Sequence, residues 1–179
     1  MRLIRSARSM QKSARRLRQQ GLRIGFVPTM GALHEGHLAL VRRARKRSDI
    51  VVVSVFVNPT QFAPHEDLAR YPRNLARDRK LLAREGVDII FAPTPTEIYP
   101  PDFDTYVVPG ELATRLEGKF RPTHFRGVAT VVAKLFNIVR PDLAVFGGKD
   151  LQQSVVIKRM VADLNLAVKI EVASTVRDR

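Results

Sequence analysis

The chain has 179 residues with a hydrophobic fraction of 45%, enough for one packed core and ordinary for a globular protein. It contains no cysteine, which excludes disulfides and thiolate metal sites, and its longest apolar runs are strand-length, far below the roughly 20 residues of a membrane span. The formal net charge is +14, and no apolar signal core follows the basic N-terminus, so we expect a soluble, cytoplasmic protein.

The first predicted element is a helix over residues 6–20, which Gly21 ends. Residues 1–47 carry 13 Lys and Arg against one acidic residue, so most of the net charge lies here. A basic arm is compatible with nucleic-acid or membrane-surface binding. No aromatic residues interleave with the arginines as single-strand binding requires. We therefore favour solvated helix faces that also attract anionic substrates.

A short strand over residues 23–27 is followed by the segment PTMGALHEGH at 28–37 and then by a helix that ends at Arg47. Two glycines, Gly31 and Gly36, allow the backbone to approach a ligand closely. The helix N-terminus near Gly36 or His37 offers free N–H groups and the positive end of a dipole. The segment therefore predicts a phosphate site.

The next strand, residues 50–57, is almost entirely β-branched, as in a strand buried on both faces of a parallel sheet. Asn58 and Pro59 end it. A helix over residues 74–85 and a strand over 87–92 follow, and then a proline-rich loop. Residues 105–108 are predicted to form a short additional strand.

Apolar residues spaced i, i+3, i+4, i+7 and i+11 predict a long helix over residues 128–139, which Pro141 ends. A buried strand at 143–146 leads into Gly-Gly-Lys-Asp, a helix whose Ile157, Met160, Val161 and Leu164 face inward, and a last strand at 168–172. Alternating strands and helices predict a doubly wound, Rossmann-like α/β sheet, with residues 1–179 as one nucleotide-binding domain.

Three polar segments, at 28–37, 58–62 and 147–150, each follow a predicted strand directly. Ligands of such sheets bind beyond the carboxyl ends of the strands, so these segments should converge on one crevice. His34 and His37 fit phosphate binding better than a metal site, because helical metal pairs prefer i, i+4 spacing and need a third ligand. One of Gln152 and Gln153 should face the crevice.

The remaining polar residues allow structural alternatives. Asn58 and Gln61 offer amides for hydroxyls or carboxylates, or form an ordinary Asn-Pro turn. Lys149 is placed to neutralise phosphates, and Asp150 to cap a helix or hold a ribose hydroxyl or Mg²⁺. Arg121 and His124 precede the long helix, where solvated positions are the default and an anion clamp is the alternative.

Five ordered motifs give the chain a specific resemblance: PTMGALHEGH (28–37), VFVNPTQF (55–62), YPR (71–73), RPTHFRGV (121–128) and GGKDLQQ (147–153). Together they resemble the pantothenate synthetase (pantoate–β-alanine ligase) family, within the class I adenylating and nucleotidyl-transferring superfamily. The resemblance implies that ATP and (R)-pantoate form pantoyl adenylate and pyrophosphate. The amine of β-alanine then attacks this anhydride to give pantothenate and AMP. It also implies Mg²⁺ and a homodimer.

The resemblance also implies roles for single residues. His37 is the position that the family assigns as a proton donor, with His34 on the phosphates and Lys149 as the main cation. The implied ATP site comprises Met30, Gly31, His34, Gly36, His37, Gly147, Lys149, Asp150 and, through its backbone, Val176. The implied pantoate and β-alanine site comprises Gln61 and Gln153, with Asn58, Thr29, Arg121 and His124 beside them. Asp150 and Asp78 are the candidate Mg²⁺ ligands.

Two departures from the family pattern affect these expectations. Gly148 stands where the family usually has Glu or Gln, so a backbone contact would survive there but a side-chain role would not. The family also continues into a Ser-Ser-Arg motif and a C-terminal lid domain, so we expect this chain to bind ligands with weak or no turnover. Two alternatives remain: another adenylyltransferase of the superfamily, and a non-enzymatic module that binds nucleic acid through residues 1–47.

Overall fold

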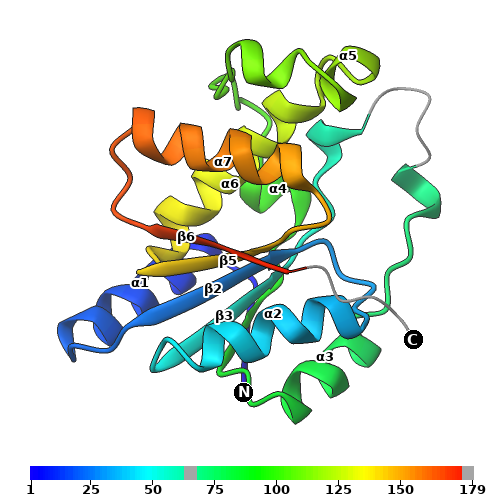
Figure 1. The fold of residues 1–179 in the computed structure, drawn as a ribbon. Helices are drawn as coiled ribbons and strands as arrows, with labels where there is room; N and C mark the ends of the chain where they lie inside the picture. Colours follow the sequence, from blue (N-terminus) through cyan, green and yellow to red (C-terminus); the bar gives the residue numbers. More distant parts are fainter. Residues whose placement is uncertain (63–67, 175–179) are drawn as a thin grey trace.

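The structure, a computed structural model, describes residues 1–62 and 68–174. They contain a six-stranded, all-parallel sheet in the order β1-β4-β3-β2-β5-β6, with helices on both faces (Figure 1). This is the doubly wound, Rossmann-like α/β fold that the alternation of strands and helices predicts. Within the described ranges, no helix combines the length and the apolar character needed to cross a membrane.

The chain reverses its direction across the sheet at β2 (Ile24–Thr29). From β2 it proceeds through β3 (Ile50–Val55) to β4 (Ile89–Phe91) on one side, and it later adds β5 (Leu143–Gly147) and β6 (Lys169–Ala173) on the other. Strands β3 and β5 both pair directly with β2. Such a switch point leaves a crevice at the carboxyl ends of the strands, where ligands of this fold class bind.

Two hydrophobic cores lie on opposite faces of the sheet. One is packed by α1 (Ala7–Gln19), α6 (His124–Val139) and α7 (Leu151–Asp163), and the other by α2 (Glu35–Arg45) and α3 (Leu75–Arg84) (Figure 1). The apolar spacing read from the sequence assigns the buried face of α6 correctly, since Val128, Val131, Val132, Leu135 and Val139 are all buried.

Shorter helical turns occupy the connections. They are η1 (Pro59–Gln61), η2 (Leu68–Arg70), α4 (Pro95–Ile98), η3 (Glu111–Ala113) and α5 (Glu117–Phe120). The sequence predicts none of them, because single turns carry no full hydrophobic period. One of them, η1, contributes to the site described below.

Three features of the fold differ from the sequence prediction. An unpredicted edge strand, β1 (Arg2–Ile4), pairs with β4. The strand predicted at 105–108 is wrong: the segment is irregular, and the Val107 N–H donates to Thr130 Oγ1 on α6 at 3.0 Å instead of to a strand. Leu164, predicted to face inward, is 49% exposed because α7 ends at Asp163.

Several basic side chains of residues 1–47 pair with carboxylates. The pairs are Arg18 with Asp142, Arg42 with Glu35 and Glu85, Arg43 and Arg47 with Glu171, and Arg45 with Asp88. Partly exposed pairs like these stabilise the fold little. They do agree with the interpretation of this segment as solvated helix faces.

Candidate functional site

The loop between β2 and α2 turns sharply and is held by Thr29 and by α3. Thr29 Oγ1 donates to the Ser54 carbonyl at 2.7 Å and accepts from the Gly31 N–H at 3.2 Å. Gly31 and Ala32 have φ of +85° and +52°, in the left-handed region. Thr29 is 8% exposed and its hydroxyl is used inside the protein, so it shapes the loop.

Asp78 reaches this loop from α3. Its carboxylate, 1% exposed, accepts from the Ala32 N–H at 3.1 Å and the Leu33 N–H at 3.0 Å. The neighbouring Arg77 donates to the Leu33 carbonyl at 3.0 Å. Asp78, one of the two candidate Mg²⁺ ligands, therefore anchors the backbone of the β2–α2 loop.

His34 caps α2. Its Nδ1 accepts from the Gly36 N–H at 3.1 Å, so in the neutral ring Nε2 carries the proton and remains a donor. A Cβ on Gly36 would lie 2.9 Å from His34 Cε1. The glycine of the His-Glu-Gly-His segment is thus needed because the His34 ring packs against its α-carbon.

His37 lies beside His34, with ring centroids 4.3 Å apart. Burial, with a smaller contribution from His34, lowers the pKa of His37 to about 4, while Asp78 opposes the shift. The His37 Nδ1 atom is buried and has no hydrogen-bond partner in the described part of the chain. Near neutral pH His37 is therefore an uncharged imidazole in the first turn of α2, with one buried nitrogen that has no partner among the described residues.

This lowered pKa predicts a pH dependence of stability. The folded state binds a proton at His37 only near pH 4, whereas the unfolded chain binds it near 6.5. Above pH 6.5 His37 is neutral in both states and costs no stability. As the pH falls to 4 the unfolded chain takes up the proton first, so the free energy of unfolding drops by about 2 kcal/mol, allowing for partial exposure of the ring. Urea unfolding of the wild type and His37→Gln at pH 7 and pH 4 measures this, and the variant should lose less stability over that range. An equal loss in both proteins would contradict the assignment.

Asn58 and Gln61 lie at η1, beyond the end of β3. Asn58 is 1% exposed, and its Nδ2 donates to Gln61 Oε1 and to the Gly127 carbonyl, each at 3.1 Å. Its Oδ1 accepts from Tyr99 at 2.8 Å and Thr60 at 3.0 Å. Both donors and both acceptor positions of Asn58 are used within the protein, so its amide supports Gln61 and has none left for a substrate.

Arg121 and His124 also act on Gln61. The Gln61 backbone carbonyl accepts from Arg121 at 3.3 Å and lies 3.0 Å from His124 Nδ1. Arg121 additionally pairs with Glu117 at 2.7 Å, and His124 is 8% exposed. These two residues, expected at the substrate, thus hold the turn that carries Gln61.

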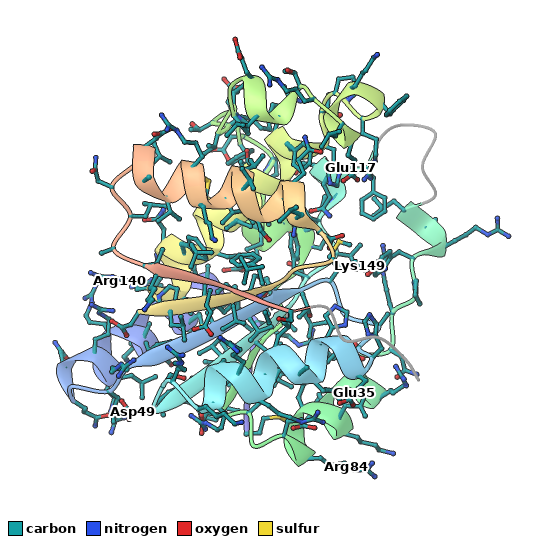
Figure 2. The ribbon with its side chains drawn as sticks, in the orientation of Figure 1. Glu35, Asp49, Arg84, Glu117, Arg140 and Lys149 are labelled. Carbon is teal, nitrogen blue, oxygen red and sulfur yellow. The ribbon has the colours of Figure 1, made fainter. Side chains whose placement is uncertain are left out.

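The β5–α7 connection brings the third polar segment to the same edge. The Gly148 N–H donates to the Ala173 carbonyl at 2.8 Å, and a Cβ on Gly148 would lie 2.8 Å from that oxygen, so the two backbones approach too closely there for a side chain. Lys149 is exposed and makes no hydrogen bond or ion pair with the described residues. Figure 2 places Lys149 at the same end of the sheet as Glu35 and Glu117.

Residues of all three polar segments line one cavity of about 170 Å³. Its polar and sulfur-containing walls are Thr29, Met30, His37, Asn58, Gln61, Tyr71, Asp150 and Gln153, and its apolar walls are Pro28, Phe56, Val128, Val131, Val132, Leu135 and Phe146. Gln152 does not line it, because its side chain bonds to the backbone of Leu112, Arg115 and Glu117. The predicted convergence of the segments is thus observed, and Gln153 is the glutamine that faces the crevice.

Some predicted residues lie around this cavity instead of on its wall: Gly31, His34, Gly36, Arg121, His124, Gly147 and Lys149. Val176 lies outside the described residues. A larger cavity of about 500 Å³ lies between residues 107–112 and α7. Its four charged lining residues form two exposed ion pairs, Arg115 with Glu111 and Arg159 with Asp163, and none of the three predicted polar segments lines it.

Two tyrosines near the site, Tyr71 and Tyr99, have no role predicted from the sequence. Tyr71 lines the cavity, and burial raises its pKa, so it remains a protonated donor. The Tyr-Pro-Arg motif was the available signal for Tyr71. Tyr99 lies in a proline-rich loop, and no pattern in the sequence marks it.

Comparison with known proteins identifies the family. The sequence profile described as pantoate-beta-alanine ligase matches residues 2–179. Pantothenate synthetase 1 of Bradyrhizobium diazoefficiens is 57% identical over 99% of this chain and 63% of its own length. The pantothenate synthetase of Thermotoga petrophila is also 57% identical, over 99% of this chain and 64% of its own length.

Solved structures agree with the sequence matches. The crystal structure of pantothenate synthetase from Thermus thermophilus is 52% identical, with a TM-score of 0.94 over 99% of this chain and 63% of that one. The Francisella tularensis pantoate-beta-alanine ligase, solved with Beta-gamma ATP and beta-alanine, is 42% identical, with a TM-score of 0.94 over 99% of this chain and 68% of that one. The chain spans less than two thirds of the length of the first two relatives. On this sequence and structural evidence, the chain belongs to the pantoate-beta-alanine ligase family.

Proposed function

We propose that this chain binds ATP and (R)-pantoate for the condensation of pantoate with β-alanine. In that reaction the pantoate carboxylate attacks the α-phosphorus, releasing pyrophosphate and forming pantoyl adenylate. The β-alanine amine then attacks the acyl carbon, giving pantothenate and AMP. The observation that carries this proposal is the cavity that joins two glutamine amides, His37 and Asp150 to an aliphatic wall.

The cavity walls match the chemistry of pantoate. Pantoate has a carboxylate, two hydroxyls and two methyl groups on one carbon. Gln61 and Gln153 offer uncharged partners for the oxygens, while α6 supplies an aliphatic surface for the methyl groups. A closed polar site must satisfy each buried oxygen, and amides do so without adding charge.

The ATP phosphates would lie at the N-terminus of α2 and beside Lys149. His34 Nε2, the His37 ring on the cavity wall and the helix dipole would provide donors and a positive field. Because His37 is uncharged near neutral pH, Lys149 is the principal cation among these groups. Together they would align two anions and bear the charge that develops at the α-phosphate.

Asp150 is the residue that fits Mg²⁺. It lies on the cavity wall, is exposed, and makes no side-chain capping bond at α7. Asp78 fits less well, because it is 1% exposed and each of its oxygens already accepts a loop N–H. Mg²⁺ is commonly held by one or two carboxylates together with substrate phosphates, so one protein carboxylate suffices.

We also propose a cytoplasmic homodimer. Five exposed apolar side chains lie on η3, at the start and end of α5 and on the first turns of α7: Leu112, which also lines the 500 Å³ cavity, Leu116, Phe120, Leu151 and Val155. Gln152 bonds to the Leu112 and Arg115 carbonyls, which keeps these elements together. A second copy of the chain would cover this surface through a twofold contact. Sedimentation velocity tests it, with twice the mass of the chain expected.

Calorimetric titration with (R)-pantoate, and separately with ATP and Mg²⁺, tests the function. Gln153→Leu should weaken pantoate binding at least tenfold, because pantoate oxygens lose a donor, which is about 1.4 kcal/mol. Lys149→Met should weaken ATP binding by a similar factor and leave pantoate binding unchanged. Lys158→Met, an exposed position on α7, is the matched control. Binding is the readout because the chain spans less than two thirds of its curated relatives.

The same titrations address the alternatives. Absence of pantoate binding, with binding of phosphopantetheine or nicotinate mononucleotide, would favour another adenylyltransferase. Salt-dependent binding of random oligonucleotides that ATP does not alter would favour a nucleic-acid module.

A further inference from the structure

Tyr99 connects a surface loop to the cavity through its hydroxyl, which bonds to Asn58 and lies 3.2 Å from Thr60 Oγ1. It follows α4, and its hydroxyl donates to Asn58 Oδ1 at 2.8 Å. Thr60 Oγ1 donates to the same oxygen at 3.0 Å. Burial raises the pKa of Tyr99 to about 12, so the phenol keeps its proton across the physiological range. Two hydroxyls thus fix the oxygen end of the Asn58 amide.

The nitrogen end of Asn58 is fixed as well. Its Nδ2 faces the Gly127 carbonyl at 3.1 Å, and a backbone carbonyl only accepts hydrogen bonds. The reversed amide would set Oδ1 against that carbonyl oxygen. The second Nδ2 proton points to Gln61 Oε1, at 3.1 Å. Asn58 therefore has one favourable orientation, and in it Asn58 donates to Gln61.

This donation determines which end of the Gln61 amide is available to a ligand. Because Oε1 accepts from Asn58, Nε2 turns the other way and lies 3.2 Å from Met30 Sδ, on the cavity wall. The Gln61 carbonyl is held by His124 and Arg121, so the backbone of the turn is fixed independently. Gln61 thus presents N–H donors to the cavity.

We propose that Tyr99, together with Thr60, is a positioning residue that acts through Asn58 to keep Gln61 Nε2 toward the cavity, selecting ligands with a carboxylate or hydroxyl oxygen at that point. The identity of the ligand as pantoate rests on the proposed function. The orientation of Gln61 does not, because it follows from bonds inside the protein. An amine placed at the same point would meet a donor and be disfavoured.

The test compares the wild type, Tyr99→Phe, and the double variant Tyr99→Phe/Thr60→Val. The first readout needs no ligand: a nuclear Overhauser contact between the Gln61 side-chain N–H protons and the Met30 methyl group. We expect the contact in the wild type, a weaker one in Tyr99→Phe, and none in the double variant. Without its two donors the buried Asn58 Oδ1 is unsatisfied, so the Asn58 amide reorients toward another donor and its bond to Gln61 Oε1 is lost. The second readout is pantoate affinity, with about a tenfold loss expected in the double variant.

Tyr106→Phe is the matched control, since it removes a hydroxyl from the same loop while keeping the ring contact with Phe103. It should keep the Overhauser contact and the pantoate affinity. Should the double variant fail to fold, Tyr99→Phe decides alone, because its ring retains the contacts with Phe56 and Phe103. An undiminished contact in the folded variants overturns the inference. If the wild type binds no pantoate, the proposed function is wrong. The Overhauser contact still tests the orientation of Gln61, because it needs no ligand.

Discussion

Gly127→Ala is expected to lower the free energy of unfolding by about 2 kcal/mol and to abolish measurable pantoate binding. An added Cβ would lie 2.3 Å from the Thr60 carbonyl oxygen and 2.7 Å from the Gln61 backbone nitrogen. Both are backbone atoms, so η1 must move away from α6. Overpacking costs roughly 1–3 kcal/mol, and an approach this close to backbone atoms places the cost near the upper end. About 2 kcal/mol remains after subtracting the gain of about 1 kcal/mol from alanine's higher helix propensity.

The loss of binding has its own cause. Moving η1 carries Gln61 away from the cavity and lengthens the bond from Asn58 to the Gly127 carbonyl, now 3.1 Å. Gly110→Ala is the matched control, because a Cβ there meets nothing within 4 Å. Urea unfolding and pantoate titration of both variants give the comparison. Equal stability and equal affinity in the two variants would show that η1 does not need its close approach to α6.

The sheet could be predicted because its strands are continuous apolar runs separated by amphipathic helices. β3 is the clearest case, since five of its six residues are Val or Ile and it pairs with β2 along its whole length. The edge strand β1 has three residues, too few for a pattern. The segment 105–108 has strand-like residues, but its Val107 backbone bonds to the Thr130 side chain on α6 instead of to a strand.

The location of the site could also be predicted, because polar segments that follow parallel strands meet at one edge. Which of its residues line the cavity and which support other residues could not be predicted. Asn58, Arg121 and His124 were expected to contact substrate, yet their partners are the backbone of Gly127 and Gln61, up to 69 positions away in the chain. A one-sequence pattern contains no information on such contacts. The same holds for Asp78, whose two N–H partners, Ala32 and Leu33, lie more than 40 positions away in the chain.

Asp78→Ala is expected to lower the free energy of unfolding by about 3 kcal/mol. Hydrogen bonds to a charged group contribute roughly 1.5–3 kcal/mol each, and this variant removes two of them. It leaves the Ala32 and Leu33 N–H groups without their acceptor in a loop where Ala32 already has φ of +52°. Asp78→Asn should lose less, since the amide retains one oxygen to accept one of the two bonds.

Asp163→Ala is the matched control for this carboxylate, because Asp163 forms an exposed ion pair with Arg159 four residues away on α7. Such pairs contribute about 0.3–0.5 kcal/mol, so the control should be nearly neutral. ATP titration adds a functional readout: Asp78→Ala should weaken ATP binding by releasing the loop that ends at His34, whereas Asp163→Ala should not. If both variants unfold at the same urea concentration, the β2–α2 loop does not depend on Asp78. If only stability falls, the loop is anchored by Asp78 but its backbone does not contact the nucleotide.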